Sequence, residues 1–146
     1  MVTVEVKGYI FNLPDELYYT TDHAWARLES DGTVTMGADE ALTKLAKTIT
    51  YVDLPIEGDA VEHGRPFATI ESAKWVGKVS APVSGKVIAV NSTLLDAPEL
   101  VNKAPYTDGW FIKVQPTALT QDLTKLLHEP EKLKEWILGE IEKYIK

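Results

Sequence analysis

The chain has 146 residues, of which 45% are hydrophobic and 25% are charged, and its formal net charge is −7 at pH 7. This length and composition predict one folded domain, residues 1–146, with a core of its own. The acidic balance argues against nucleic acid as a partner, because binding phosphate requires a basic face. The chain contains no cysteine, so any thiol chemistry has to come from an attached group.

The N-terminal residues alternate between apolar and polar types and do not form the apolar centre of a signal peptide. No stretch approaches eighteen apolar residues, so we expect no membrane span. These two features predict a soluble, cytoplasmic protein that does not associate with membranes.

Most of the predicted elements are short strands, bounded by turn residues rich in glycine, proline and aspartate. Asp39 is placed to cap a short helix over 41–48, and 96–102 is expected to form a turn and one helical turn. Beyond residue 118 apolar residues recur at helical spacing, and Pro130 is expected to separate two helices. The prediction is a mainly β protein, an antiparallel β sandwich with a short internal helix and a C-terminal helical segment over about 118–146. Its predicted strands cover 2–6, 21–28, 33–37, 49–54, 67–73, 75–81, 86–90 and 110–114.

Lys74 stands where two of these strands meet. No glycine, asparagine or proline separates the strands, and Gly64 and Gly85 flank the pair at similar distances. The arrangement predicts a hairpin that presents one primary amine at its tip. A lysine at a hairpin tip is also an ordinary surface residue, so this feature alone does not decide a function.

The patterns typical of enzymes and metal sites are missing from the sequence. Its three histidines are far apart, and none lies in a His-x-His or His-Glu-x-x-His spacing. There is no Gly-x-Ser-x-Gly nucleophile motif and no glycine-rich phosphate loop. We therefore expect no metal ion and no catalytic set, and predict that the protein is not an enzyme.

The region around Lys74 resembles the lipoyl-attachment region of the glycine-cleavage H protein family, and the similarity extends over about 17–115. In that family a lysine carries lipoic acid as an amide, on a fold of the lipoyl/biotinyl barrel-sandwich type. The resemblance therefore implies lipoic acid on Lys74. It also implies that Glu71, Ser72, Trp75 and Lys78 surround the arm, and that His23 and Ala24 belong to its pocket. The segments that carry the resemblance are 19–25 (YTTDHAW), 51–55 (YVDLP), 71–74 (ESAK), 81–85 (APVSG), 98–106 (PELVNKAPY) and 109–110 (GW).

The residue type at position 74 suits this role. Lysine offers a primary amine on a flexible four-carbon stem, and acylation removes its charge. With a lipoyl group attached, the arm would reach roughly 12 to 14 Å. The resemblance implies a monomeric swinging-arm carrier. Its expected partners are a lipoate ligase or lipoyl-synthesis enzymes, together with glycine-cleavage enzymes and dihydrolipoamide dehydrogenase.

Three positions depart from the family pattern. Ala24 stands where the family has glutamate, Lys78 where many members have aspartate, and Trp75 where a small residue is usual. In the family the two acids help to hold a cationic, aminomethyl-loaded arm. Their replacement makes the surroundings of the arm less suited to a cation. Trp75 is expected to be largely exposed at the hairpin tip and to serve docking; the alternative is that it folds back onto the sheet.

The run 72–78 (SAKWVGK) resembles a second branch, the lipoate-binding proteins associated with heterodisulfide-reductase-like sulfur oxidation. We favour the hypothesis that the chain carries sulfur for such a complex. The alternative is a glycine-cleavage H protein that carries the aminomethyl group, with Ala24 and Lys78 merely tolerated. A third hypothesis is a binding or structural module that kept the fold without lipoylation.

Overall fold

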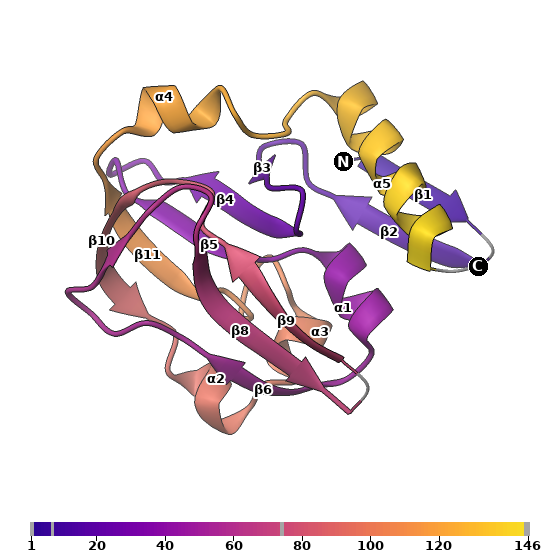
Figure 1. The fold of residues 1–146 in the computed structure, drawn as a ribbon, viewed down its shortest axis with the longest axis horizontal. Helices are drawn as coiled ribbons and strands as arrows, with labels where there is room; N and C mark the ends of the chain where they lie inside the picture. Colours follow the sequence, from indigo (N-terminus) through magenta and orange to yellow (C-terminus); the bar gives the residue numbers. More distant parts are fainter. Residues whose placement is uncertain (1, 7, 74, 145–146) are drawn as a thin grey trace.

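The computed structural model describes residues 2–6, 8–73 and 75–144, and in it the strands form three antiparallel sheets (Figure 1). The two-stranded sheet consists of β1 (Val2–Val6) and β2 (Tyr9–Leu13). The three-stranded sheet has the order β6 (Ile49–Asp53), β8 (Pro66–Ser72) and β9 (Trp75–Ser80). The six-stranded sheet has the order β3 (Tyr18–Tyr19), β4 (Ala24–Leu28), β5 (Val34–Ala38), β11 (Ile112–Pro116), β10 (Gly85–Val90) and β7 (Ala60–Val61).

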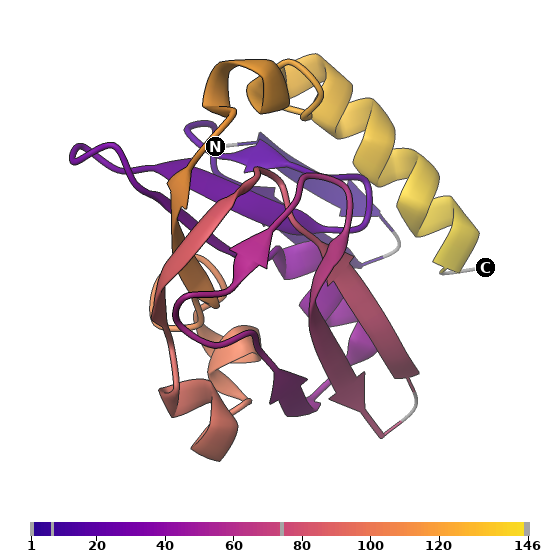
Figure 2. The ribbon, with the colours of Figure 1, turned by 60° about the vertical axis from the view of Figure 1, so that its left-hand side comes forward.

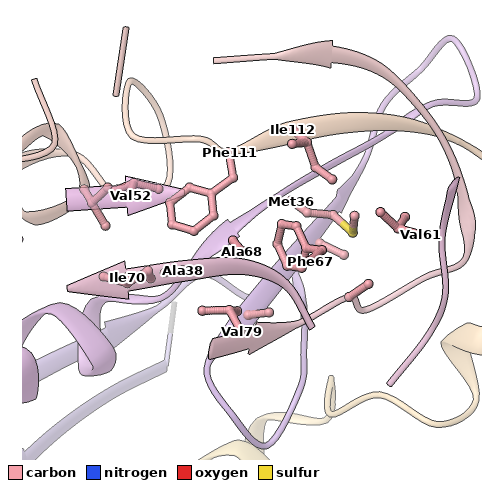
Figure 3. Packing of buried hydrophobic residues seen from close by; sticks show 14 of the residues in the cluster. Met36, Ala38, Val52, Val61, Phe67, Ala68, Ile70, Val79, Phe111 and Ile112 are labelled. Atoms are coloured by element: carbon pink, nitrogen blue, oxygen red, sulfur yellow. The ribbon is translucent and has the colours of Figure 1, made fainter. Parts of the chain in front are cut away.

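The main core lies between the six-stranded and three-stranded sheets. Figure 3 shows Phe67 of β8 and Phe111, just before β11, within this core, and their ring centroids are 6.1 Å apart. Val52 of β6 and Ile70 of β8 are fully buried in the same cluster. Because alternate side chains of a strand face the same side, Ala68 and Ile70 of β8 point into this core, and β6 adds Ile49 and Val52 on either side of a register shift. The predicted antiparallel β architecture is confirmed.

The short helix α1 (Glu40–Ala46) begins as its sequence predicts. Asp39 is its N-cap, and its side chain accepts a hydrogen bond from the backbone N–H of Leu42 at 2.9 Å. The helix ends at Ala46, before the predicted end at 48, because Lys47 has a positive φ of 68°. Asn102 stabilises this end by donating to the Lys47 carbonyl at 2.7 Å and accepting from the Ile49 N–H at 2.8 Å.

A second core joins the two ends of the chain. The helix α5 (Pro130–Tyr144) lies across the β1–β2 hairpin (Figure 1), and its Leu133 and Ile137 are fully buried with Phe11 and Leu13 of β2. Pro130 occupies the first turn of α5, where the missing N–H costs no hydrogen bond. The predicted separation of two C-terminal helices is confirmed. The remaining helices are α2 (Thr93–Asp96), α3 (Leu100–Lys103) and α4 (Leu119–Leu123).

Several strand boundaries differ from the prediction. The strand expected from residue 21 begins at Ala24, because the His23 N–H bonds back to the Thr20 carbonyl in a turn. The strand expected from residue 110 begins at Ile112, because the Trp110 N–H bonds to the Thr107 carbonyl. The strand β2, which pairs with β1, was not predicted.

Candidate functional site

The β8–β9 hairpin closes over a very short connection. The two strands pair from Pro66 with Ser80 up to Ser72 with Trp75, which leaves Ala73 and Lys74 as the connection. Ala73 is exposed, and Lys74 lies outside the described residues. The ends of both strands lie at the periphery of the molecule (Figure 2). In the sequence, position 74 comes two residues after the last paired residue of β8 and directly before the first of β9.

A pocket of about 550 Å³ opens beside β9. Helix α1 forms an apolar wall, whereas the loop before β4 and the helix α5 contribute polar groups. A cavity of this size with an apolar wall and a few polar groups suits a ligand with an aliphatic chain. We call it the arm pocket, and define it by Thr21, Asp22, His23, Leu42, Leu45, Ala46, Trp75, Lys78 and Glu140.

Trp75 does not project freely from the hairpin. Its indole lies over Gly77, two residues along the same strand, and it packs half-buried against the main core. A Cβ atom at position 77 would come within 2.0 Å of the Trp75 Cζ2 atom, so the glycine is what permits this contact. The expectation that Trp75 is largely exposed is therefore wrong: its ring forms part of the arm pocket.

Replacing Gly77 with alanine is expected to displace the Trp75 indole from the arm pocket, because ring and methyl group would occupy the same space. The ring is the movable partner, so we expect a stability loss of about 1 kcal/mol or less. The measurement is ¹⁹F NMR of protein labelled with 5-fluorotryptophan, with Trp75→Phe assigning the resonance. A Trp75 resonance that is unchanged in Gly77→Ala would contradict this placement of the ring.

His23 lies at the back of the arm pocket between two carboxylates. Its Nδ1 is 3.0 Å from Asp39 Oδ2, and its Nε2 is 3.3 Å from Glu140 Oε1, an ion-pair distance without the geometry of a hydrogen bond. The Trp136 ring covers it, with centroids 4.9 Å apart. Burial, the largest influence on the His23 pKa, acts to lower it, but Asp39, Glu140 and Asp22 together outweigh burial and raise the pKa above 6.5.

This raised pKa predicts how the stability depends on pH. Protonated His23 stabilises the folded state fully below pH 6.5, its ordinary pKa, and this contribution is lost as the pH rises through the higher folded-state pKa. We therefore expect the free energy of unfolding to decline above pH 6.5 in the wild type. In His23→Asn, which tolerates the positive φ of 75°, the decline should be smaller. Urea unfolding from pH 5 to pH 9 measures the free energy of unfolding of both proteins. Equal declines with pH in the two proteins would contradict the raised pKa of His23.

Asp22 fastens the loop before β4 to the hairpin strand β9. Its Oδ2 accepts a hydrogen bond from the Ser80 N–H at 2.8 Å, and its Oδ1 accepts one from the Thr20 hydroxyl. The pocket wall formed by the loop is thereby held against the wall formed by Trp75 and Lys78. Asp22 thus shapes the arm pocket, although the sequence analysis did not assign it there.

The structure brings together three of the seven residues predicted for the arm and its pocket: His23, Trp75 and Lys78. Ala24 is fully buried in the main core opposite Ala38, away from the residues that line the pocket. Ser72 and Glu71 lie on the hairpin outside the pocket, and Lys74 is not among the described residues. Ser72 is buried, with a hydroxyl that has no hydrogen-bond partner in the described structure, and Glu71 is half-buried between Tyr51 and Val76 on the opposite face.

Glu140 was also missed by the sequence analysis. A signal for it exists, because Trp136 and Glu140 are four residues apart and so share one face of α5. That face also carries the buried Leu133 and Ile137. A carboxylate that continues a buried apolar stripe indicates a partner at that point, and the partner here is His23.

Neither a group of metal ligands nor a membrane-spanning helix occurs in the described part of the chain. Within residues 2–6, 8–73 and 75–144 no three histidine, aspartate or glutamate side chains are grouped to hold a metal ion. Among the same residues, none of the helices combines the length and the apolar character that crossing a bilayer requires. The arm pocket therefore remains the candidate functional site.

A family model and the sequences of individual proteins both match this chain, and they point to the same family. Residues 17–138 match the family model described as glycine cleavage H-protein. The chain belongs to the glycine cleavage H-protein family. The glycine cleavage system H protein of Shewanella loihica is 44% identical over 110 residues, 75% of this chain and 85% of that protein. The one from an Enterobacter species is 47% identical over 104 residues, 71% of this chain and 81% of that protein.

The fold agrees with this membership. The crystal structure of a glycine cleavage system H protein from Mycobacterium marinum superposes with a TM-score of 0.76, at 31% identity, covering 84% of this chain and 98% of that one. Glycine cleavage H proteins are carriers, not catalysts, and hold lipoate covalently on a lysine. The predicted family, the carrier role and the lipoyl cofactor are thus confirmed. The similarity gives no support to the sulfur-oxidation branch.

The arm pocket fits the lipoyl group. Its apolar wall of Leu42, Leu45 and Ala46 suits the aliphatic part of such an arm, and the buried His23 Nε2 lacks a well-formed hydrogen bond. Trp75 and Lys78 form the side of the pocket nearest in sequence to position 74. These residues would bind and orient the arm, and their packing would exclude water from its cargo.

Proposed function

We propose that this chain is the H protein of a glycine cleavage system, lipoylated on Lys74, and that it carries the aminomethyl group of glycine between partner enzymes. The observation that carries the proposal is the family match over 17–138, which includes both the hairpin and nearly all of the arm pocket. A lipoyl group held on Lys74 would supply a disulfide as the acceptor for the aminomethyl group, and the residues of the arm pocket would bind and orient it.

Lys74 is the lysine that we propose for lipoylation, because the strand pairing leaves it and Ala73 as the hairpin connection. Lys78 is the other lysine close by, but it lies within β9 and pairs with Thr69. A modifying enzyme reaches the end of a hairpin more easily than a residue within a paired strand. A rigid hairpin also fixes the point from which a tethered arm swings, which raises its effective concentration at partner active sites.

The charge of the arm pocket also favours the aminomethyl cargo over the sulfur cargo. The sulfur hypothesis depended on the loss of two acids through Ala24 and Lys78. The pocket nevertheless contains the carboxylates of Asp22 and Glu140 beside the ammonium group of Lys78, and its His23 imidazole is already paired with Asp39. Its surroundings are therefore not those of an anion site.

The proposal also implies a cellular location and a set of partner enzymes. We infer that it acts as a monomer in the cytoplasm. Its partners would be the other glycine-cleavage enzymes, dihydrolipoamide dehydrogenase, and a lipoate ligase or lipoyl-synthesis enzymes. The net charge of −7 suits encounters with basic surfaces on these partners.

The test is to lipoylate the protein and incubate it with glycine and glycine decarboxylase, beside the lipoylated H protein of Shewanella loihica as the control. We expect both proteins to gain the mass of one aminomethyl group, at initial rates within about tenfold of each other. Failure of the fully lipoylated chain to load, while the control loads, contradicts the proposal. A mass gain of sulfur from thiosulfate in its place would favour the sulfur-oxidation hypothesis.

A further inference from the structure

The C-terminal turns of α5 bring a carboxylate into the arm pocket. This carboxylate lies outside the part of the chain that the family model matches. The family model ends at residue 138, and Glu140 lies two positions beyond it. The Glu140 side chain is only 19% exposed, and its Oε1 is 3.3 Å from the buried His23 Nε2. The β1–β2 hairpin supports this placement, because α5 packs on it through Leu133 and Ile137.

Glu140 is the carboxylate of the arm pocket that can still accept a ligand. Both oxygens of Asp22 already accept hydrogen bonds, from the Ser80 N–H and the Thr20 hydroxyl. Glu140 faces His23 with one oxygen, and among the side chains described, which end at residue 140, none donates a hydrogen bond to the other. A partly buried carboxylate with a free oxygen selects a hydrogen-bond donor, above all a cationic one.

The apolar wall of the arm pocket indicates the orientation that a bound arm would adopt. Leu42 and Leu45 line the pocket together with Trp75, and this surface suits an aliphatic chain. An arm that begins next to Trp75 and lies along this wall would bring its cargo toward the loop before β4 and α5. The cargo end therefore meets His23 and Glu140.

We propose that Glu140 receives the protonated amine of the cargo in the arm pocket and is a specificity residue for a cationic cargo. This inference rests on the proposed function. It assigns to the C-terminal helix the acidic role that Ala24, buried in the core, cannot fulfil.

The contact between Glu140 and His23 allows cargo binding to be followed through the pKa of His23. Asp39 faces His23 from the N-cap of α1, Asp22 from its own loop and Glu140 from α5, while Lys78 lines the pocket from β9. A cation bound to Glu140 competes with the imidazolium for the same carboxylate. By linkage, loading of the arm has to lower the His23 pKa, and cargo retention has to improve as the pH rises through that pKa.

The experiment compares the lipoylated wild type with Glu140→Gln and with Glu135→Gln, a control with the same charge change on an exposed position of α5. Each protein is loaded with glycine and glycine decarboxylase and then purified. Intact mass over time gives the lifetime of the cargo, and NMR of ring-labelled histidine gives the His23 pKa before and after loading. Glu140→Asp, which keeps the charge, tests rescue.

We expect Glu140→Gln to shorten the lifetime of the cargo by about tenfold or more, as for loss of one charge-assisted hydrogen bond. Loading should lower the His23 pKa in the wild type and in Glu135→Gln, but not in Glu140→Gln. Glu140→Asp should restore part of the lifetime. Equal lifetimes and equal pKa shifts in all variants overturn the role of Glu140, whereas failure of every variant to load overturns the proposed function itself.

Discussion

Replacing Lys74 with arginine is expected to abolish lipoylation of this chain completely while leaving the fold intact. The guanidinium keeps the positive charge but offers no amine that can form the lipoyl amide. Arginine is also a long cationic side chain, so we expect the exchange to leave the fold intact. Incubation with lipoate ligase, ATP and lipoate, followed by intact mass, measures the loss.

Lys78→Arg is the matched control, since it makes the same chemical change four residues away in the same hairpin. We expect it to gain one lipoyl group at the wild-type rate. Thermal unfolding of both variants confirms that the fold is retained. A lipoyl group on Lys74→Arg, at Lys78 or elsewhere, would show that the assignment of Lys74 is wrong.

Replacing Trp25 with alanine is expected to lower the free energy of unfolding by about 3 to 5 kcal/mol, the usual cost of truncating a buried tryptophan. Trp25 is fully buried, and its Nε1 donates to the carbonyls of Ala38 and Pro105, each at 3.0 Å. Gly37 permits the close approach of the indole, because a Cβ atom there would lie 2.7 Å from the ring. The truncation removes this packing and leaves two buried carbonyls short of a donor.

Tyr51→Ala provides the comparison, because this aromatic ring is 47% exposed on the outer face of β6. We expect it to change the free energy of unfolding by only about 0.5 kcal/mol. Urea unfolding followed by circular dichroism measures both variants at one pH. A cost for Trp25→Ala no larger than that for Tyr51→Ala would contradict the description of Trp25 as a buried residue that ties β4 to the α3–β11 connection.

The elements that the sequence predicts well are those whose local chemistry leaves few alternatives. The alternation of apolar residues in β8 predicts a strand with one buried face, and Asp39 is an N-cap both by residue type and by its hydrogen bond to Leu42. Pro130 begins α5 for an equally local reason. The placement of these elements along the chain could therefore be read from the residues.

Contacts between distant segments account for what the sequence did not predict. Trp75 lies over Gly77 of its own strand, but the pocket that its ring lines is formed by α1, α5 and the loop before β4. The end of α1 depends on Asn102, which lies far along the chain. Glu140 enters the pocket because α5 packs on β1 and β2, a pairing that helical periodicity alone does not specify. The single-domain organisation over 1–146 stays a prediction.

The proposed carrier role depends on the attachment of lipoate to Lys74. This is tested by the intact mass of the protein isolated from its native cells, followed by peptide mapping. We expect a mass gain of one lipoyl group, carried by the peptide that contains Lys74. An unmodified protein in cells whose other lipoyl proteins are fully lipoylated would contradict the carrier role, and a lipoyl group on a different lysine would contradict the assignment of Lys74.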